Sequence, residues 1–180
     1  MKKVVLITGT SSGLGLAIAV QAAEAGHTVY ASMRDLSKAS LLQEAAQKAE
    51  VAINLIELDV QSGNSVQAAV EQILAAEGRI DVLVNNAGMG FIRSLEQASE
   101  QEIKDVLDIN FMGVVRVTKA VLPTMRNARS GHVINISSVG GLVGQPFNEV
   151  YCSAKFAVEG LTESMASYMT PSFRSEEHTS

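Results

Sequence analysis

The chain has 180 residues, 47% of them hydrophobic and 18% charged, which predicts one globular domain with a sizeable core and excludes a disordered chain. Its 14 Lys and Arg residues against 19 Asp and Glu residues give a net charge of −5, which excludes the strongly basic surface of a typical nucleic-acid-binding protein. One cysteine, no His/Cys cluster with metal-ligand spacing and no apolar run near the roughly 18 residues of a membrane span favour a cytoplasmic protein without metal.

The first half of the chain alternates between two kinds of segment. Short apolar runs predict strands that are buried on both faces, and apolar residues at helical spacing predict helices between them. The predicted strands cover residues 4–8, 28–33, 53–58 and 82–85. The predicted helices cover about 14–25, 36–49 and 66–74.

The second half continues this alternation less regularly. Apolar spacing predicts a long helix over 111–125, a fifth strand over 132–136 and a last helix that includes 154–168. Strands that alternate with helices predict a doubly wound α/β fold, in which a parallel sheet has helices on both faces. Two mononucleotide-binding halves would supply six strands, so the sheet is expected to be incomplete at its C-terminal end. We assign residues 1–173 to this single domain.

A glycine-rich loop joins the first predicted strand to the first helix. Its spacing is wider than that of the common dinucleotide-binding fingerprint, but the glycines have the same physical roles. Gly9 permits the tight turn, Gly13 lets the backbone approach a pyrophosphate, and Gly15 allows close packing, while the helix N-terminus offers unpaired N–H groups. A glycine-rich turn without a ligand is the alternative. The strand–helix–strand pattern around the loop favours the cofactor.

The second predicted strand leads into Arg34 and not into the acidic residue that binds a ribose 2′-hydroxyl. An arginine at this place fits a 2′-phosphate, and Ser11 and Ser12 add nearby hydroxyl donors. The sequence therefore favours NADP over NAD. In the alternative interpretation, Arg34 is solvated or pairs with Asp35.

Four polar residues are candidates for a catalytic centre. Tyr151 and Lys155 share one helix face, one turn apart, and an ammonium beside a phenol stabilises the phenolate. Ser138 follows the fifth strand at the carboxyl edge of the sheet, and Asn110 enters the long helix. Taken singly, they could be a half-buried tyrosine, a surface lysine, a turn cap and a helix N-cap. Their combination with the glycine loop favours catalysis.

In their order along the chain, these motifs resemble those of the classical short-chain dehydrogenase/reductases, over residues 2 to about 170. The segment from 138 to 160 further resembles the 17β-hydroxysteroid and retinol dehydrogenase branch. The motifs that carry the resemblance are the T-G-x-x-x-G-x-G loop of residues 8–15, Asn85-Asn86-Ala87-Gly88, Asn110, Ser138 and Tyr151-x-x-x-Lys155.

The resemblance implies a Rossmann fold and hydride transfer between NADP(H) and a secondary alcohol or carbonyl compound. Tyr151 would act as general acid or base, and Ser138 would bind the same substrate oxygen. Lys155 would stabilise the phenolate and hold the nicotinamide ribose, and Asn110 would support a water chain that conducts protons. The further cofactor contacts that the resemblance implies are Leu14, Asp59, Val60, Asn86, Ala87 and Gly88.

After Pro171 the sequence departs from the family pattern. A further strand, a Pro-Gly turn, a substrate-covering helix and a final strand are expected but do not follow, and residues 174–180 resemble a translated sequencing-library adaptor. We therefore expect a C-terminally truncated chain whose full-length form is a homodimer or homotetramer. A non-catalytic NADP(H)-binding regulator and an inactive truncated fragment are the alternatives to an active oxidoreductase.

Overall fold

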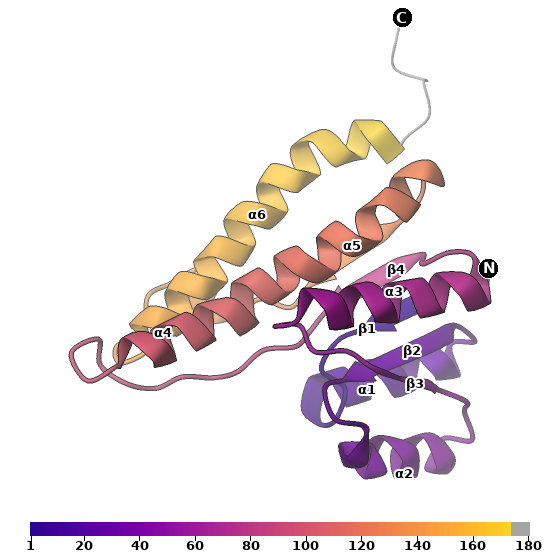
Figure 1. Ribbon diagram of the computed structural model, residues 1–180, viewed down its shortest axis with the longest axis horizontal. Coiled ribbons are helices and arrows are strands. Elements are labelled where there is room, and N and C mark those ends of the chain that lie inside the picture. Colours follow the sequence, from indigo (N-terminus) through magenta and orange to yellow (C-terminus); the bar gives the residue numbers. More distant parts are fainter. Residues whose placement is uncertain (174–180) are drawn as a thin grey trace, which may run out of the picture.

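The computed structural model describes residues 1–173, so the predicted polar tail at 174–180 lies outside the described residues. Its centre is a five-stranded sheet in the order β3-β2-β1-β4-β5, and all neighbouring strands run parallel (Figure 1). The strand order reverses between β1 and β4, and open α/β sheets bind ligands at the carboxyl edge beside such a reversal. The strands are β1 (Val4–Ile7), β2 (Thr28–Met33), β3 (Asn54–Glu57), β4 (Val82–Asn85) and β5 (His132–Asn135).

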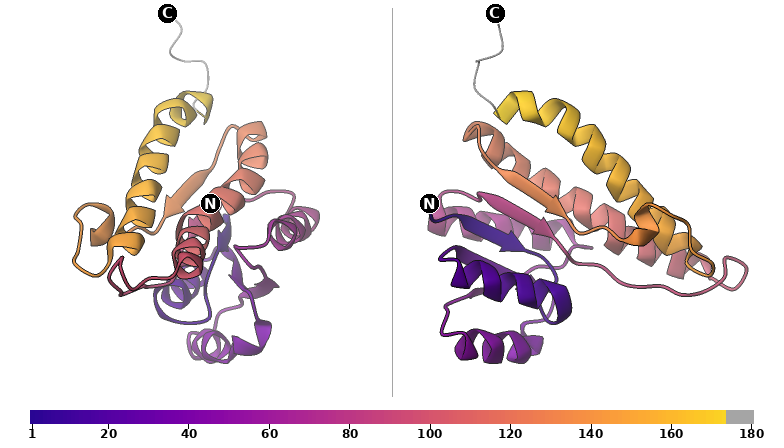
Figure 2. Two further views of the ribbon diagram at one scale, coloured as in Figure 1. Left: turned by 60° about the vertical axis from the view of Figure 1, so that its left-hand side comes forward. Right: turned by 180° about the vertical axis from the view of Figure 1, so that it is seen from behind.

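Helices cover both faces of the sheet, which confirms the predicted doubly wound fold. On one face α3 and α5 pack on the strands, and on the other face α1 and α2 do so. Helix α6 runs alongside α5 (Figure 2). The helices are α1 (Gly13–Glu24), α2 (Ser40–Lys48), α3 (Gly63–Glu77), α4 (Glu100–Leu107), α5 (Gly113–Asn127) and α6 (Glu149–Phe173). Within the described part of the chain, no helix is both long and apolar enough to cross a membrane.

Strand β1 shows why the sequence gives two cores. Its four residues are all buried, and successive side chains of a strand point to opposite faces. Val4 and Leu6 enter the core beneath α3 and α5, whereas Val5 and Ile7 enter the core beneath α1. A continuous apolar run, without polar alternation, is therefore what a central strand between two helical layers requires.

Two predicted helices differ from those observed. The segment expected at 36–49 begins with a 3-10 turn, η1 (Leu36–Lys38), because the Asp35 side chain caps Ser37, and α2 starts only at Ser40. The long helix begins before residue 111, since α4 starts at Glu100 and continues into α5 through the π-helical segment η2 (Asp108–Met112). Asn110 therefore lies inside a continuous helical rod, and its interpretation as a helix N-cap is wrong.

Strand β5 is the last strand of the described sheet. It pairs with β4 along one edge, and its other edge faces a groove of about 460 Å³ between β5, α5 and α6. Ile134 of β5 is 47% exposed, and Met165 and Met169 of α6 line the same groove. The described fold thus leaves an apolar strip beside an open sheet edge.

Candidate active site

The glycine-rich loop lies between β1 and α1, at the reversal in strand order. Gly9 and Gly13 have φ angles of +70° and +60°, in the region that favours glycine. A Cβ at Gly15 would come within 2.4 Å of the Asn86 side-chain nitrogen, so the loop after β4 needs glycine there to pack this closely. Ser12, the N-cap residue of α1, makes no side-chain cap hydrogen bond. The first N–H groups of α1 are left without that cap, as anion binding at a helix N-terminus requires.

Thr8 and Asn86 brace this loop against the loop after β4. The Thr8 hydroxyl oxygen accepts hydrogen bonds from the N–H groups of Asn86 and Ala87, both at 3.0 Å. The Asn86 side-chain nitrogen in turn donates to the carbonyl oxygens of Thr8 at 2.9 Å and Gly9 at 2.8 Å. Asn86 therefore shapes the site by fixing the backbone of Thr8 and Gly9.

A cavity of about 570 Å³ opens at this edge of the sheet and gathers most of the predicted cofactor residues. Those that line it are Gly9, Ser11, Ser12, Leu14, Gly15, Arg34, Asp59, Val60, Asn86, Ala87 and Gly88. Four predicted cofactor residues do not line the cavity: Gly13, which shapes the turn beside it, and Asn110, Tyr151 and Lys155. The sequence did not single out the remaining apolar and polar lining residues, which are Met33, Lys38, Leu58, Gln61, Met89 and Ile109.

Arg34 and Lys38 place two cations at one corner of the cavity. Asp35 lines the same corner, and its carboxylate accepts hydrogen bonds from the Ser37 hydroxyl at 2.6 Å and the Ser37 N–H at 3.0 Å. These bonds hold the pKa of Asp35 below its usual value. Among the described residues, no ion pair joins Arg34 to Asp35. The corner can therefore offer positive charge to an anion, and the signal for Lys38 was a second cation four residues after Arg34.

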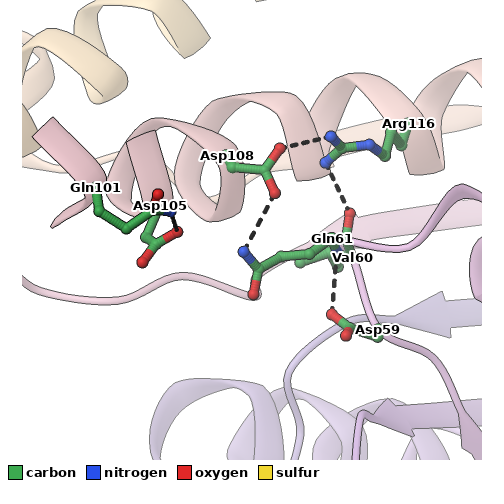
Figure 3. A network of polar contacts seen from close by, with 7 residues as sticks. All are labelled: Asp59, Val60, Gln61, Gln101, Asp105, Asp108 and Arg116. Atoms are coloured by element: carbon green, nitrogen blue, oxygen red, sulfur yellow. Dashed lines mark hydrogen bonds and ion pairs between the residues drawn. The ribbon is translucent and has the colours of Figure 1, made fainter. Parts of the chain in front are cut away.

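The loop between β3 and α3 forms another part of the cavity wall. The Asp59 N–H donates to the Ser65 hydroxyl, and the Asp59 carboxylate accepts from the Gln61 N–H, both at 3.0 Å. The Val60 carbonyl oxygen accepts a hydrogen bond at 3.1 Å from Arg116 of α5 (Figure 3). Contacts to two helices thus hold this wall in place.

Tyr151 and Lys155 lie together at the start of α6, as predicted. The Lys155 ammonium is 5.7 Å from the centre of the Tyr151 ring and donates to the Ile136 carbonyl oxygen at 2.9 Å. The lysine is only 5% exposed, and this burial lowers its pKa. The carbonyl contact and the aromatic face compensate part of the lost hydration of the ammonium.

Ser138 follows β5, and its side chain lies beside Gly140, as does the ring of Tyr151. Its hydroxyl oxygen accepts a hydrogen bond at 3.1 Å from the Gly140 N–H, so it also caps the 3-10 turn η3 (Val139–Gly141). A Cβ at Gly140 would lie 3.5 Å from Cε1 of Tyr151 and 3.6 Å from the Ser138 hydroxyl oxygen. Both side chains therefore adjoin Gly140. The turn-cap interpretation is correct for Ser138, and the hydroxyl can still donate its own proton.

Asn110 is fully buried in η2 and connects the helical rod to the loop after β4. Its side-chain nitrogen donates to the carbonyl oxygens of Met89 at 2.9 Å and Val106 at 3.0 Å, and its side-chain oxygen accepts from the Met89 N–H at 3.2 Å. A Cβ at Gly88 would lie 2.8 Å from this oxygen and 3.8 Å from the Lys155 ammonium. Asn110 and Lys155 thus meet at Gly88, which also lines the cavity.

A ladder of polar side chains behind the site was missed by the sequence analysis. The Asn85 side-chain nitrogen donates to the Thr118 hydroxyl at 2.9 Å and to the Asn135 side-chain oxygen at 2.8 Å. The Asn135 side-chain nitrogen donates to the Thr162 hydroxyl at 2.8 Å. This ladder ties α5 and α6 to the carboxyl ends of β4 and β5. Its signal in the sequence was an amide residue at the carboxyl end of each of two apolar strands.

Comparison with known proteins agrees with this geometry. The chain matches the family model described as short chain dehydrogenase over residues 3–172. It therefore belongs to the short-chain dehydrogenase family, a family of oxidoreductases, and the resemblance that the motifs indicated is confirmed.

Individual relatives extend the comparison. Human 17-beta-hydroxysteroid dehydrogenase type 1 is 47% identical over 176 residues, which cover 94% of this chain and 53% of that protein. A 3-ketodihydrosphingosine reductase of Bacteroides thetaiotaomicron is 46% identical, with 94% of this chain and 59% of that protein covered. The chain thus spans little more than half the length of these curated relatives.

Solved structures show the same fold. A short-chain dehydrogenase from Streptomyces avermitilis superposes with a TM-score of 0.87 at 38% identity, covering 95% of this chain and 62% of that one. A metagenomic short-chain oxidoreductase, solved in complex with NADP, superposes with a TM-score of 0.88 at 30% identity and covers 94% of this chain and 77% of that one.

Proposed function

We propose that residues 1–173 form the cofactor-binding and catalytic domain of an NADP(H)-dependent oxidoreductase that acts on a secondary alcohol or carbonyl compound. The observation that carries the proposal is the convergence of Tyr151, Ser138 and Lys155 next to a cavity lined by the glycine loop. The names of relatives, a hydroxysteroid dehydrogenase and a keto-compound reductase, support this substrate class.

The cavity fits a nicotinamide dinucleotide. The uncapped start of α1 and the backbone of the glycine loop would hold the pyrophosphate, and Asp59 and Val60 would border the adenine. Arg34 and Lys38 would bind a 2′-phosphate, which is the ground for preferring NADP. The nicotinamide, when bound, supplies or accepts the hydride.

The protein's own chemistry is the movement of a proton at the substrate oxygen. In the reductive direction the Tyr151 hydroxyl gives its proton to the carbonyl oxygen, and in the oxidative direction it takes the proton of the alcohol. Ser138 donates a hydrogen bond to the same oxygen, and the buried Lys155 ammonium stabilises the phenolate that remains. Asn110 keeps Met89 and Gly88 in place beside the lysine.

Replacement of Tyr151 by Phe tests the catalytic role. We expect the rate of NADPH oxidation with a ketone substrate to fall by about 100-fold or more, because the general acid is removed. The affinity for NADPH, measured by fluorescence titration, stays the same. Equal turnover in both proteins would contradict the proposal and favour a non-catalytic regulator. NADPH binding without turnover by the unchanged chain would favour the inactive fragment.

Replacement of Arg34 or Lys38 by Ala tests the cofactor preference. Because each cation would form charge-assisted hydrogen bonds with the 2′-phosphate, we expect the Kd for NADPH to rise about tenfold or more, with little change for NADH. Arg126→Ala, which removes an exposed arginine of α5 that does not line the cavity, is the matched control. Parallel losses for both cofactors would argue against a 2′-phosphate site.

A cytoplasmic location and a homodimeric or homotetrameric full-length form stay predictions from the sequence. The small-molecule substrate of the proposal agrees with the family. Its identity calls for a screen of ketones and secondary alcohols with the full-length protein.

A further inference from the structure

A polar network joins the wall of the cavity beside β3 to the helical rod that carries Asn110 (Figure 3). One guanidinium nitrogen of Arg116 forms an ion pair with the Asp108 carboxylate, and the other donates to the Val60 carbonyl oxygen at 3.1 Å. The Gln61 side-chain nitrogen donates to the other Asp108 oxygen at 3.2 Å. Arg116 therefore binds one partner on its own rod and one on the loop.

The ion pair is partly shielded from water. The side chains of Arg116 and Asp108 are 27% and 29% exposed, in contrast to 63% and 82% for the pair of Lys104 and Glu100 on the same rod. Screening by solvent is weaker at such a site than at the surface. The planar guanidinium reaches two acceptors in fixed directions, which a lysine ammonium on a flexible stem does not reproduce.

The two ends of the network belong to different parts of the site. Val60 and Gln61 line the cavity at the proposed adenine end. Asp108 is the first residue of η2, and Asn110 lies two residues later. The Asn110 side chain holds Met89 by its N–H and its carbonyl oxygen, and Met89 lines the cavity as well.

The segment that carries Asn110 is a π-turn, and it contacts the loop at Val60 in two ways. A π-turn inside an α-helix is rare and often occurs at functional sites. Here the contacts of Asp108 hold the turn from outside, and Gly113, which follows it, lies against Val60 so closely that a Cβ would come within 2.9 Å of the valine side chain. Both polar and packing contacts therefore join the loop at Val60 to the turn.

We propose that Arg116 is a positioning residue that couples the adenine end of the cavity to the π-turn holding Asn110 and Met89. An adenine nucleotide that stabilises the loop at Val60 thereby also stabilises the hydrogen bond from the Met89 N–H to the Asn110 side-chain oxygen. The part of the proposal that concerns a nucleotide rests on the proposed function, whereas the connection between Arg116 and Met89 does not.

Hydrogen exchange of the Met89 N–H tests the connection without any ligand. In Arg116→Met we expect this amide to exchange about tenfold faster than in the unchanged chain, because the hydrogen bonds that support the turn are lost. The Leu6 N–H in β1 reports on global stability, and it should change much less. Arg126→Met, an exposed arginine of the same helix, is the matched control and should change neither amide.

Adenosine 2′,5′-bisphosphate, the adenine half of NADP, tests the coupling. Saturation with it should slow Met89 exchange several-fold in the unchanged chain and leave it unchanged in Arg116→Met. Arg116→Lys keeps the charge near Asp108 but loses the second acceptor, so it should fold normally and still lose most of the effect.

The outcomes separate the two proposals. Equal Met89 exchange in Arg116→Met and the unchanged chain without nucleotide overturns the positioning role, as does a change shared equally by Leu6. Equal slowing by the bisphosphate in all variants overturns the coupling. Failure of the unchanged chain to bind the bisphosphate overturns the proposed NADP function and the coupling, while the ligand-free exchange still decides the role of Arg116.

Discussion

Close backbone contacts at the candidate site depend on residues that lack a Cβ. A Cβ at Gly9 would lie 2.7 Å from the Cα of Ala87, and one at Gly88 would lie 2.8 Å from the Asn110 side-chain oxygen. Both distances are well inside van der Waals contact. The loops after β1 and β4 therefore meet through their backbones, and the Asn110 side chain of the π-turn packs directly on the backbone of Gly88.

Substitution of Gly88 by Ala tests this packing. We expect a loss of about 1–3 kcal/mol in the free energy of unfolding, because the new methyl group displaces Asn110 from Met89. Urea denaturation measures the loss. Gly90→Ala is the matched control, since a Cβ there would meet open space and neither glycine has a positive φ angle. Similar stability in the two variants would show that the π-turn accommodates the new methyl group at little cost in free energy.

At the scale of elements, the sequence predicted the strands better than the long helical rod. The strands appear as short apolar runs, so all five were found, with ends that differ by at most one residue, although β3 and β5 are only partly buried. Helix α4 was missed because it is largely polar, although Ser99 and Glu102 form a capping box that the sequence displays. The π-turn at Asp108–Met112 shifts the helical periodicity, and no local pattern predicts it.

The same distinction holds for the site. Tyr151, Lys155 and the glycine loop form short motifs, and their combination along the chain marked them as candidates. Arg116 and Thr162 act on residues 56 and 27 positions away, so only the folded chain brings them to their partners. Side chains that connect distant elements were therefore the ones that sequence reasoning missed.

The polar ladder between β5 and α6 gives a prediction at this scale. Asn135→Leu leaves polar atoms of Asn85 and Thr162 without this partner, and we expect a loss of about 1–3 kcal/mol in the free energy of unfolding. Thr162→Val removes the acceptor of the hydrogen bond that the Asn135 side chain donates. The double variant should be more stable than the sum of the two single losses predicts, because the second change removes a group already unpaired. Strict additivity in urea denaturation would show that the two side chains do not interact.

At the scale of the whole molecule, we expect the open edge of β5 to promote association between copies of the chain. Among the described strands β5 pairs with β4 alone, and the apolar groove between α5 and α6 adjoins its free edge. Unpaired strand edges with exposed apolar side chains promote association between chains. A folded chain with an intact cofactor cavity can therefore still be difficult to keep monodisperse.

Ile134→Lys should reduce this association. A charge on the edge strand disfavours pairing with another chain, so we expect sedimentation velocity to show a smaller share of large species, with an unchanged circular dichroism spectrum. Leu41→Lys, which replaces a 55% exposed residue of α2 far from β5, is the control and should leave the share unchanged. Equal reduction by both variants would indicate a general effect of charge and not of the strand edge.

The hydroxyl of Thr8 has a consequence for how a ligand enters the site. This one oxygen accepts hydrogen bonds from two N–H groups of the loop after β4, and the Asn86 side chain donates back to two carbonyl oxygens of the loop after β1. These four hydrogen bonds fix the backbone beneath the cavity in the absence of a ligand. A ligand arriving there meets a preorganised surface and has little chain to immobilise, so little of its interaction energy is offset by lost conformational entropy. Ser12, Leu14 and Arg34 line the same cavity and are exposed, so their side chains have room to adjust to a ligand.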